Sequence, residues 1–183
     1  MEVKDYIQVH DNCINIKTLC NFLKFINTIN FERATVGGKN HVNTKIRNTH
    51  SYGLTTTNES LSDVHWHNYL LKFLNKAFLN YASTIDEVQI RCFEPLQLLK
   101  YEKGGFYRKH VDHFTDIPRT LSFIYFLNND YEGGELIFKL GTGDIKIENK
   151  PNRLVIWPSN YLYPHEVTTV TKGTRYSLVT WAL

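Results

Sequence analysis

The chain has 183 residues, of which 42% are hydrophobic and 14% aromatic, a composition typical of a globular protein with one sizeable core. Its 21 Lys and Arg exceed its 18 Asp and Glu by three, and the charges are dispersed along the chain. This distribution argues against a nucleic-acid-binding surface. No run of about 18 apolar residues occurs, so we expect no membrane span.

The cysteines and the N-terminal residues bear on the cellular compartment in which we expect the protein. Cys13, Cys20 and Cys92 form an odd set without a C-x-x-C pair, so we expect reduced thiols that bind no metal. The segment Met1–Asp5 lacks the basic-then-apolar pattern of a signal peptide. We therefore expect a soluble, intracellular protein of the cytoplasm.

Two helices are predicted in the first half of the chain. The first, Asn15–Ile29, has apolar residues at spacings of three and four: Leu19, Phe22, Leu23, Ile26 and Ile29. The second begins after Ser60 or Ser62, either of which can cap it, and runs to about Tyr81. Its expected buried face is Leu70, Phe73, Leu74 and Phe78. Both helices are expected to buttress a sheet.

A polar stretch separates these helices and is predicted to be a loop or an irregular hairpin. It comprises Val36–Asn40 and Thr44–Thr57, with Gly37, Gly38 and Gly53 as breakers. A loop of this length in a compact domain usually has a function, so Thr35–Thr57 is a candidate substrate contact.

Short strands are predicted from Ile85 onward, separated by turn signals such as Gly104-Gly105 and Gly141-Thr142-Gly143. They are Val88–Phe93, Leu96–Tyr101, Leu121–Leu127, Glu135–Phe138, Ile145–Ile147, Leu154–Trp157, His165–Val170 and Arg175–Trp181. Eight strands without interleaved helices indicate a sandwich or barrel, and a jelly roll leaves an open mouth between its two sheets. We expect a mostly β (α+β) fold in a single domain, 1–183, with helical support in 1–84 and a jelly-roll core in 85–183.

Three residues in the second half of the chain can bind one metal ion. Side chains two apart in an extended segment point the same way, so His110 and Asp112 project together. His165 lies 53 positions after Asp112 and opens a predicted strand. Two histidines and one carboxylate can occupy one face of an octahedral Fe(II) and leave the opposite face open.

Arg175, ten residues after His165, suggests what fills part of the open face. Its planar guanidinium matches a carboxylate in bidentate fashion and keeps its charge when buried. A cosubstrate with a distant carboxylate would be its partner, although an edge-strand arginine paired with a glutamate gives the same pattern. Together the four residues predict an enzyme that uses iron, dioxygen and a 2-oxo acid.

A family resemblance follows from the motifs around these residues. Tyr101–His113 resembles the first motif of the prolyl 4-hydroxylase-like 2-oxoglutarate oxygenases. Arg119–Asn128 and Tyr131–Leu136 resemble their central strand and the Gly-Gly-Glu turn after it. Arg153–Pro158, Pro164–Val167 and Gly173–Trp181 resemble the closing motifs. The resemblance covers about Leu96–Leu183 and implies a double-stranded β-helix.

The resemblance implies roles for individual residues. His110, Asp112 and His165 would ligate Fe(II), and Arg175 would bind the 5-carboxylate of 2-oxoglutarate. Further cosubstrate-pocket positions would be Tyr101, Leu136 and Trp181. Ascorbate is a candidate reductant for an enzyme of this kind.

One position departs from the pattern. Some relatives place a tyrosine two residues before the Asn128 position, where its hydroxyl helps hold the cosubstrate, whereas this chain has Phe126. Tyr125 is expected to face the other way. Arg175 would then act with Tyr101, with Ser122 or with a water molecule.

The remaining histidines are not expected to bind the metal. His113 should point away from it by strand alternation. Four more are read as surface or substrate-side residues: His41, His50, His65 and His67.

The implied reaction hydroxylates a C–H bond while 2-oxoglutarate is decarboxylated to succinate. The implied substrate is a prolyl residue in a peptide or protein, with Arg119 and Tyr107 as candidate contacts. Free amino acids or other small molecules stay open as alternatives. An oxidative demethylase of nucleic acid usually carries a second arginine at the position of Trp181. A halogenase would replace Asp112 with a small residue, and a non-enzymatic binding module would have lost a ligand or Arg175.

Overall fold

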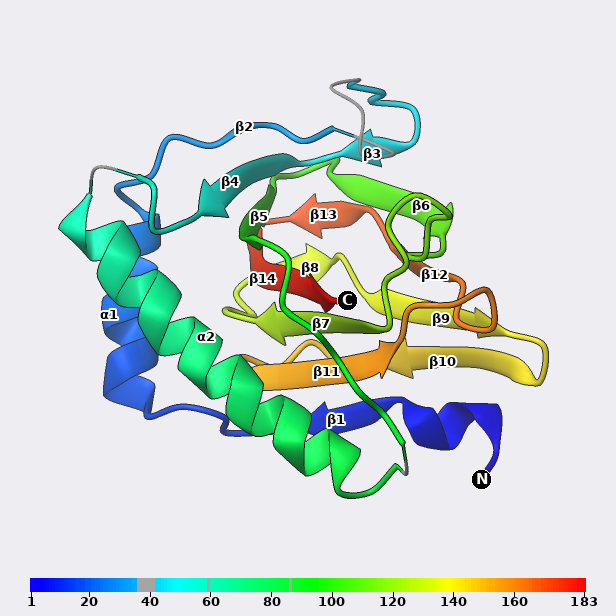
Figure 1. Ribbon diagram of the computed structural model, residues 1–183. Helices are drawn as coiled ribbons and strands as arrows, with labels where there is room; N and C mark the ends of the chain where they lie inside the picture. The colour runs from blue at the N-terminus through cyan, green and yellow to red at the C-terminus, as the bar shows by residue number, and fades with distance from the viewer. Residues whose placement is uncertain (36–41, 59, 86) are drawn as a thin grey trace.

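The computed structural model describes residues 1–35, 42–58, 60–85 and 87–183. Two antiparallel sheets face each other, and both α-helices lie on the outer side of the larger one (Figure 1). The larger sheet has the order β1 (Gln8–His10), β11 (Arg153–Pro158), β7 (Leu121–Phe126), β14 (Arg175–Ala182), β5 (Leu96–Tyr101), β4 (His50–Leu54) and β2 (Glu32–Arg33). The smaller sheet has the order β10 (Gly143–Ile147), β9 (Leu136–Leu140), β12 (His165–Val167), β6 (Phe106–His110) and β3 (Arg47–Asn48). Strands β8 (Glu132–Gly133) and β13 (Val170–Lys172) form a separate pair, and a short 3-10 helix spans Val3–Tyr6.

The two helices begin at capping side chains. Helix α1 spans Ile16–Ile26, and the Asn15 side chain accepts a hydrogen bond from the backbone of Lys17. Helix α2 spans Leu61–Ala82 and is capped by Ser60, so Ser60 and not Ser62 is the start signal. Their buried side chains pack with the outer face of the larger sheet into one core. The predicted buttressing role is confirmed. No helix in the described ranges is both long and apolar enough to cross a bilayer.

The central strands of the larger sheet are buried on both faces, which explains their nearly continuous apolar sequence. In β7, Phe123 and Tyr125 pack in the helix-side core, whereas Ile124 and Phe126 pack in a second core between the two sheets. Phe138 of the smaller sheet belongs to that second core. The double-stranded β-helix predicted from the sequence is confirmed, and the space between its sheets is where a site can form.

The predicted strand Val88–Phe93 is wrong. The stretch is irregular apart from an isolated bridge between Phe93 and Ala182. Glu87 has a φ of 64°, and Pro95 cannot donate a ladder hydrogen bond, so a regular strand is interrupted at both ends. The segment nevertheless hydrogen-bonds along the end of β14.

Two further predictions need correction. Part of the polar stretch Thr44–Thr57 forms strands, because β4 pairs with β5 and β3 pairs with β6. Both strands are short and lie near sheet edges, where polar side chains are tolerated and apolar alternation is absent. The predicted strand His165–Val170 is divided into β12 and the start of β13. The loop prediction for Val36–Asn40 lies outside the described residues.

Candidate active site

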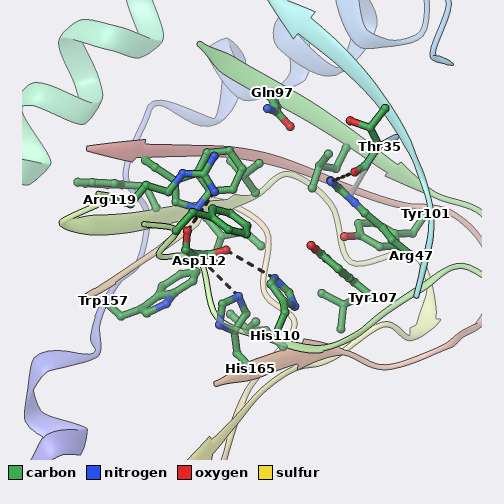
Figure 2. Close-up of a pocket in the computed structure, with 18 residues that line it drawn as sticks. Thr35, Arg47, Gln97, Tyr101, Tyr107, His110, Asp112, Arg119, Trp157 and His165 are labelled. Atoms are coloured by element: carbon green, nitrogen blue, oxygen red, sulfur yellow. Dashed lines mark hydrogen bonds and ion pairs between the residues drawn. The ribbon is translucent and has the colours of Figure 1, made fainter. Parts of the chain in front are cut away.

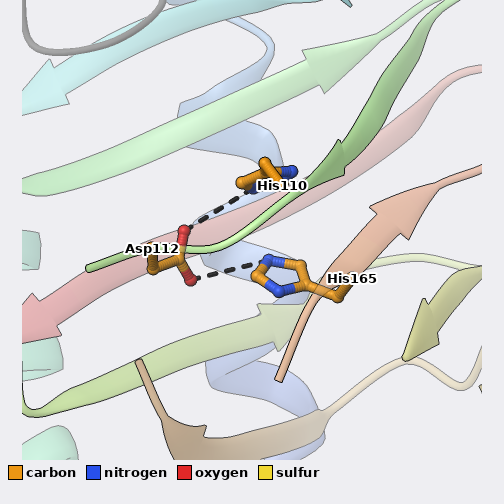
Figure 3. A group of neighbouring side chains, drawn as sticks. All are labelled: His110, Asp112 and His165. Atoms are coloured by element: carbon orange, nitrogen blue, oxygen red, sulfur yellow. Dashed lines mark ion pairs between the residues drawn. The ribbon is translucent and has the colours of Figure 1, made fainter. Parts of the chain in front are cut away.

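Strand register brings the two predicted histidine ligands together. His110 is the last residue of β6, His165 is the first of β12, and the two are direct cross-strand partners. Asp112 lies in a bend two residues after β6 ends. One ligating atom of each residue lies within 4.8 Å of the others, and the three side chains converge (Figure 3). Within the described ranges, no other three His, Cys, Asp or Glu side chains converge this closely.

The spacing of the donor atoms suits a single ion. His110 Nε2 lies 3.6 Å from Asp112 Oδ1, and His165 Nε2 lies 3.5 Å from Asp112 Oδ2. Donors at adjacent corners of an octahedron about 2.1 Å from the metal lie about 3 Å apart. A set of two imidazoles and one carboxylate is the donor chemistry of non-haem Fe(II). These residues therefore fit the metal that the sequence implies.

Both imidazoles are oriented by backbone carbonyls. His110 Nδ1 lies 2.8 Å from the carbonyl oxygen of Arg108, and His165 Nδ1 lies 3.0 Å from that of Tyr163. Donation from Nδ1 to these carbonyls leaves the Nε2 lone pairs facing Asp112. Burial lowers the pKa of His165 to about 4. The imidazole is therefore neutral near pH 7 and able to bind a cation.

Asp112 is held in place by two serines. Its Oδ2 accepts a hydrogen bond of 2.7 Å from Ser122 Oγ, which lies 2.8 Å from Ser159 Oγ. Burial raises the pKa of Asp112, but the neighbouring His165 and His110 and the Ser122 hydroxyl outweigh it and leave that pKa below its usual range. The carboxylate is therefore ionised at neutral pH. Ser122 is engaged at Asp112 and not at Arg175.

A cavity opens beside the three ligands, and aromatic side chains form much of its wall (Figure 2). The Tyr107 ring stacks on His110 with ring centroids 3.6 Å apart, and the Trp157 ring meets His165 at 5.0 Å. The predicted cosubstrate positions also line the cavity: Tyr101, Leu136 and Trp181. Most of this wall is apolar, so it can exclude water from a bound metal.

Arg175 is completely buried and lies one layer behind the cavity wall. It is the cross-strand partner of Tyr101, and its guanidinium lies 5.1 Å from the ring centroids of Tyr101 and of Phe126. Its Nη1 donates to Ser177 Oγ at 2.9 Å. Its Nε and Nη2 have no hydrogen-bond partner in the described part of the chain. The edge-strand alternative is wrong, because β14 lies between β7 and β5.

The two predicted substrate contacts line the cavity in different ways. Arg119 forms a bidentate ion pair with Glu94, at 2.6 and 2.7 Å, and lies 3.7 Å above the Trp181 ring. Its remaining nitrogen donates to the carbonyl of Asp112 at 3.2 Å. Arg119 therefore fixes the Trp181 ring and the bend after β6 that carries Asp112. Tyr107 is held between His110 and Arg47.

Arg47 lines the cavity and belongs to the stretch Thr35–Thr57 that was predicted to contact substrate, although no motif singled it out. It is 9% exposed, its guanidinium lies 4.8 Å from the Tyr107 ring centroid, and Nη1 donates to the Thr35 carbonyl at 3.0 Å. Its Nε has no partner among the described residues. Arg47 stood in a polar stretch without a motif, and only the pairing of β3 with β6 places it here. Glu94 and Ser159 were also missed, because no local motif marks them and each meets its partner, Arg119 or Ser122, only in the folded chain.

The other histidines stay apart from the ligands where they are described. His113 Nδ1 lies 3.3 Å from the carbonyl of Arg119, and the half-buried His67 contacts Asn68. His65 packs edge-on against Trp66 in α2. His50 lies in β4, paired with Lys100, and His41 lies outside the described residues.

Comparisons with known proteins agree with this geometry. Residues 96–183 match the 2OG-Fe(II) oxygenase superfamily. A PKHD-type hydroxylase from Alteromonas mediterranea is 37% identical over 101 residues, which cover 50% of this chain and 43% of that protein. The chain thus spans less than half the length of this relative.

Solved structures show the same fold over nearly the whole chain. A prolyl hydroxylase from Trichoplax adhaerens, in complex with a peptide fragment of the hypoxia inducible factor oxygen degradation domain, has a TM-score of 0.78 and 18% identity. The match covers 97% of this chain and 83% of that one. A prolyl-4-hydroxylase from Pseudomonas putida has a TM-score of 0.75 and 21% identity, covering 97% and 92%. The chain therefore belongs to the 2OG-Fe(II) oxygenase superfamily, and its double-stranded β-helix is the fold of the prolyl hydroxylases.

Proposed function

We propose that the protein is an Fe(II)- and 2-oxoglutarate-dependent dioxygenase that hydroxylates a prolyl residue in a peptide or protein. The observation that carries the proposal is the convergence of His110, Asp112 and His165 within 4.8 Å at the wall of a cavity. The family match and the prolyl hydroxylase fold support the same reaction class.

The residues present fit the metal and the cosubstrate. The His110, Asp112 and His165 side chains would hold Fe(II), and the buried Arg175 offers two free donors to a carboxylate. Bound iron and 2-oxoglutarate would supply, with dioxygen, the oxidising power for an unactivated C–H bond. Ascorbate is part of the proposal as the reductant that keeps the iron ferrous.

The contribution of the chain itself is orientation and exclusion of water. Tyr107 stacked on His110 and Trp157 against His165 restrict both imidazoles. The Ser122 hydroxyl fixes one oxygen of Asp112 and leaves the carboxylate ionised. The ligands are therefore organised before any ion binds, which reduces the cost of assembling the site.

The cavity mouth suits an extended peptide better than an anionic polymer. Arg119 is neutralised by Glu94, so the two side chains together present little net charge. The unpartnered Nε of Arg47 can donate to one peptide carbonyl, and the Trp181 ring at the cavity wall offers an apolar surface to a pyrrolidine ring. A peptide-bound neighbour of the same fold supports this substrate class.

The test is direct detection of the product. Protein loaded anaerobically with Fe(II), 2-oxoglutarate and a panel of proline-rich peptides is exposed to air, and peptide masses are measured. We expect the gain of one oxygen atom on proline, with formation of succinate. Asp112→Ala should abolish both while the circular dichroism spectrum is unchanged, because one metal ligand is lost.

A matched control is Asp144→Ala, which removes an exposed carboxylate paired with Lys139 far from the ligands in sequence and should leave turnover unchanged. Near-normal succinate formation by Asp112→Ala would contradict the proposed metal site. Hydroxylation of free amino acids but of no peptide would overturn the proposed substrate.

A further inference from the structure

Three buried polar atoms near Arg175 have no hydrogen-bond partner within the described ranges. They are Nε and Nη2 of Arg175 and Oη of Tyr131. Arg175 is 0% exposed and Tyr131 is 8% exposed, so water does not readily satisfy these groups. Unpaired buried donors cost free energy, and such a cluster in a folded protein calls for an explanation.

The three atoms belong to side chains that meet at one glycine. A Cβ placed on Gly134 would lie 3.0 Å from Arg175 Cδ and 3.3 Å from Tyr131 Cε2. Gly134 also has a φ of 64°, a backbone conformation that glycine adopts readily. The Gly133-Gly134 turn therefore lets the tyrosine ring and the arginine stem approach each other.

Tyr131 is fixed from its other side as well. Gly173 has a φ of 73°, and a Cβ there would lie 3.0 Å from Tyr131 Cα and 2.6 Å from the Asp130 carbonyl oxygen. This close approach fixes the backbone of Tyr131, and the ring extends from it to the contact at Gly134. The close packing at these two glycines therefore holds Tyr131 beside Arg175.

The free nitrogens of Arg175 form one edge of its guanidinium. Because Nη1 is engaged by Ser177, Nε and Nη2 remain as a side-on pair of donors, the geometry that accepts both oxygens of a carboxylate. Burial raises the pKa of Tyr131 more than the adjacent Arg175 lowers it, so the hydroxyl keeps its proton at neutral pH and can donate. The Arg175 nitrogens and the Tyr131 hydroxyl thus offer three hydrogen-bond donors, and the guanidinium offers one positive charge, to a bound anion.

Three other side chains near Arg175 or Asp112 do not supply a hydroxyl to the guanidinium. Phe126 contacts the guanidinium but has no hydroxyl, and Ser122 is hydrogen-bonded to Asp112. Tyr125, next to Phe126, donates to Asn152 in the helix-side core. Tyr131 is the side chain with a free buried hydroxyl next to Arg175 among the described residues.

We propose that the Tyr131 hydroxyl, together with Nε and Nη2 of Arg175, binds the distal carboxylate of the dicarboxylate cosubstrate. Tyr131 thereby supplies the hydroxyl that Phe126 lacks. This inference rests on the proposed function, because that function requires a 2-oxo dicarboxylate to extend from the metal toward Arg175.

The test measures binding without turnover. Protein loaded with Mn(II) under nitrogen is titrated by calorimetry with 2-oxoglutarate and, separately, with oxalate, which can chelate the metal but has no distal carboxylate. Tyr131→Phe should weaken 2-oxoglutarate binding about 10-fold and leave oxalate binding unchanged, since one hydrogen bond to a charged group is lost. The oxalate arm also shows that the variant is folded and binds metal.

Tyr81→Phe is the matched control, because that buried hydroxyl donates to the Tyr6 carbonyl away from the cavity and its loss should change neither affinity. Unchanged 2-oxoglutarate affinity in Tyr131→Phe would overturn the inference, as would an equal loss for both ligands. If the parent protein binds neither ligand, the proposed function itself fails. Binding of both ligands by the parent with no effect of Tyr131→Phe removes only the role of Tyr131.

Discussion

At the scale of single residues, the site depends on groups whose charge is set by burial. His165 is 5% exposed and lies between Asp112, Phe138 and Trp157. Desolvation keeps its imidazole neutral, and the Tyr163 carbonyl selects the tautomer that presents Nε2 to a metal. The residue types of the ligands could be read from the sequence, but their protonation could not, because it depends on packing.

The metal-free protein should lose stability in acid through His165. Burial lowers the pKa of this residue to about 4, whereas an exposed histidine has a pKa of about 6.5. The unfolded chain therefore takes up the proton first, and stability falls as the pH drops from about 6.5 toward 4, by up to about 3 kcal/mol. Urea unfolding with chelator present, repeated across this pH range, measures the effect.

His165→Gln provides the comparison, since an amide does not titrate. Its unfolding free energy should depend less steeply on pH between 6.5 and 4 than that of the parent. Parallel pH profiles for the two proteins would show that His165 is not the group responsible.

At the scale of secondary-structure elements, a buried asparagine connects the N-terminal segment to the β-sandwich. Asn152, in the turn before β11, accepts hydrogen bonds from the backbone of Ile14 at 2.9 Å and from Tyr125 Oη at 2.6 Å. Its amide donates to the Ile14 carbonyl at 2.7 Å. Its φ is 63°, a left-handed conformation that asparagine tolerates. This residue aligns the start of α1 with β7.

Asn152→Ala should destabilise the protein by about 3 kcal/mol or more, because it leaves three buried polar groups unpaired and puts alanine in a left-handed conformation. Asn152→Gly should recover about 1 kcal/mol of that loss by relieving the backbone. Urea denaturation of both variants measures the two contributions. The exposed Asn75→Ala in α2 should stay within about 0.5 kcal/mol of the parent, and an equally small change for Asn152→Ala would refute the connecting role.

At the scale of the whole molecule, the helices and the two sheets form two separate cores with different roles. The helix-side core supports the larger sheet, while the second core between the sheets surrounds the ligands and Arg175. Ligands from β6, β12 and the bend after β6 are held in place before a metal binds. Metal binding should therefore stabilise the folded state by mass action rather than create it.

A divalent ion should raise the melting temperature of the whole protein. At a free concentration 100-fold above its Kd, one ion adds about 2.7 kcal/mol, and each kcal/mol shifts the melting temperature by about 2–4 °C for a chain of this size. Differential scanning calorimetry with Mn(II) measures the shift. Asp112→Ala should show little or none of it, whereas Asp144→Ala should respond as the parent does. An equal shift in Asp112→Ala would place the ion elsewhere.

The sequence by itself determined the local chemistry and the class of fold. The three-to-four spacing of Leu19, Phe22 and Ile26 predicts α1 because one helix face must be apolar, and short apolar runs between turns predict strands such as β5 and β14. The ligand residue types around His110 and His165 indicated the metal, because few side chains bind Fe(II).

Only the tertiary structure decided which distant groups meet. Strand register sets His110 opposite His165, and the β3–β6 pairing carries Arg47 to the cavity. Glu94 reaches Arg119 from a position just after the irregular segment Val88–Phe93, which the sequence suggested was a strand. Tyr131 acquires its place beside Arg175 through contacts at Gly134 and Gly173. Such contacts join residues far apart in the chain and depend on sheet pairing and close packing, which local periodicity does not encode.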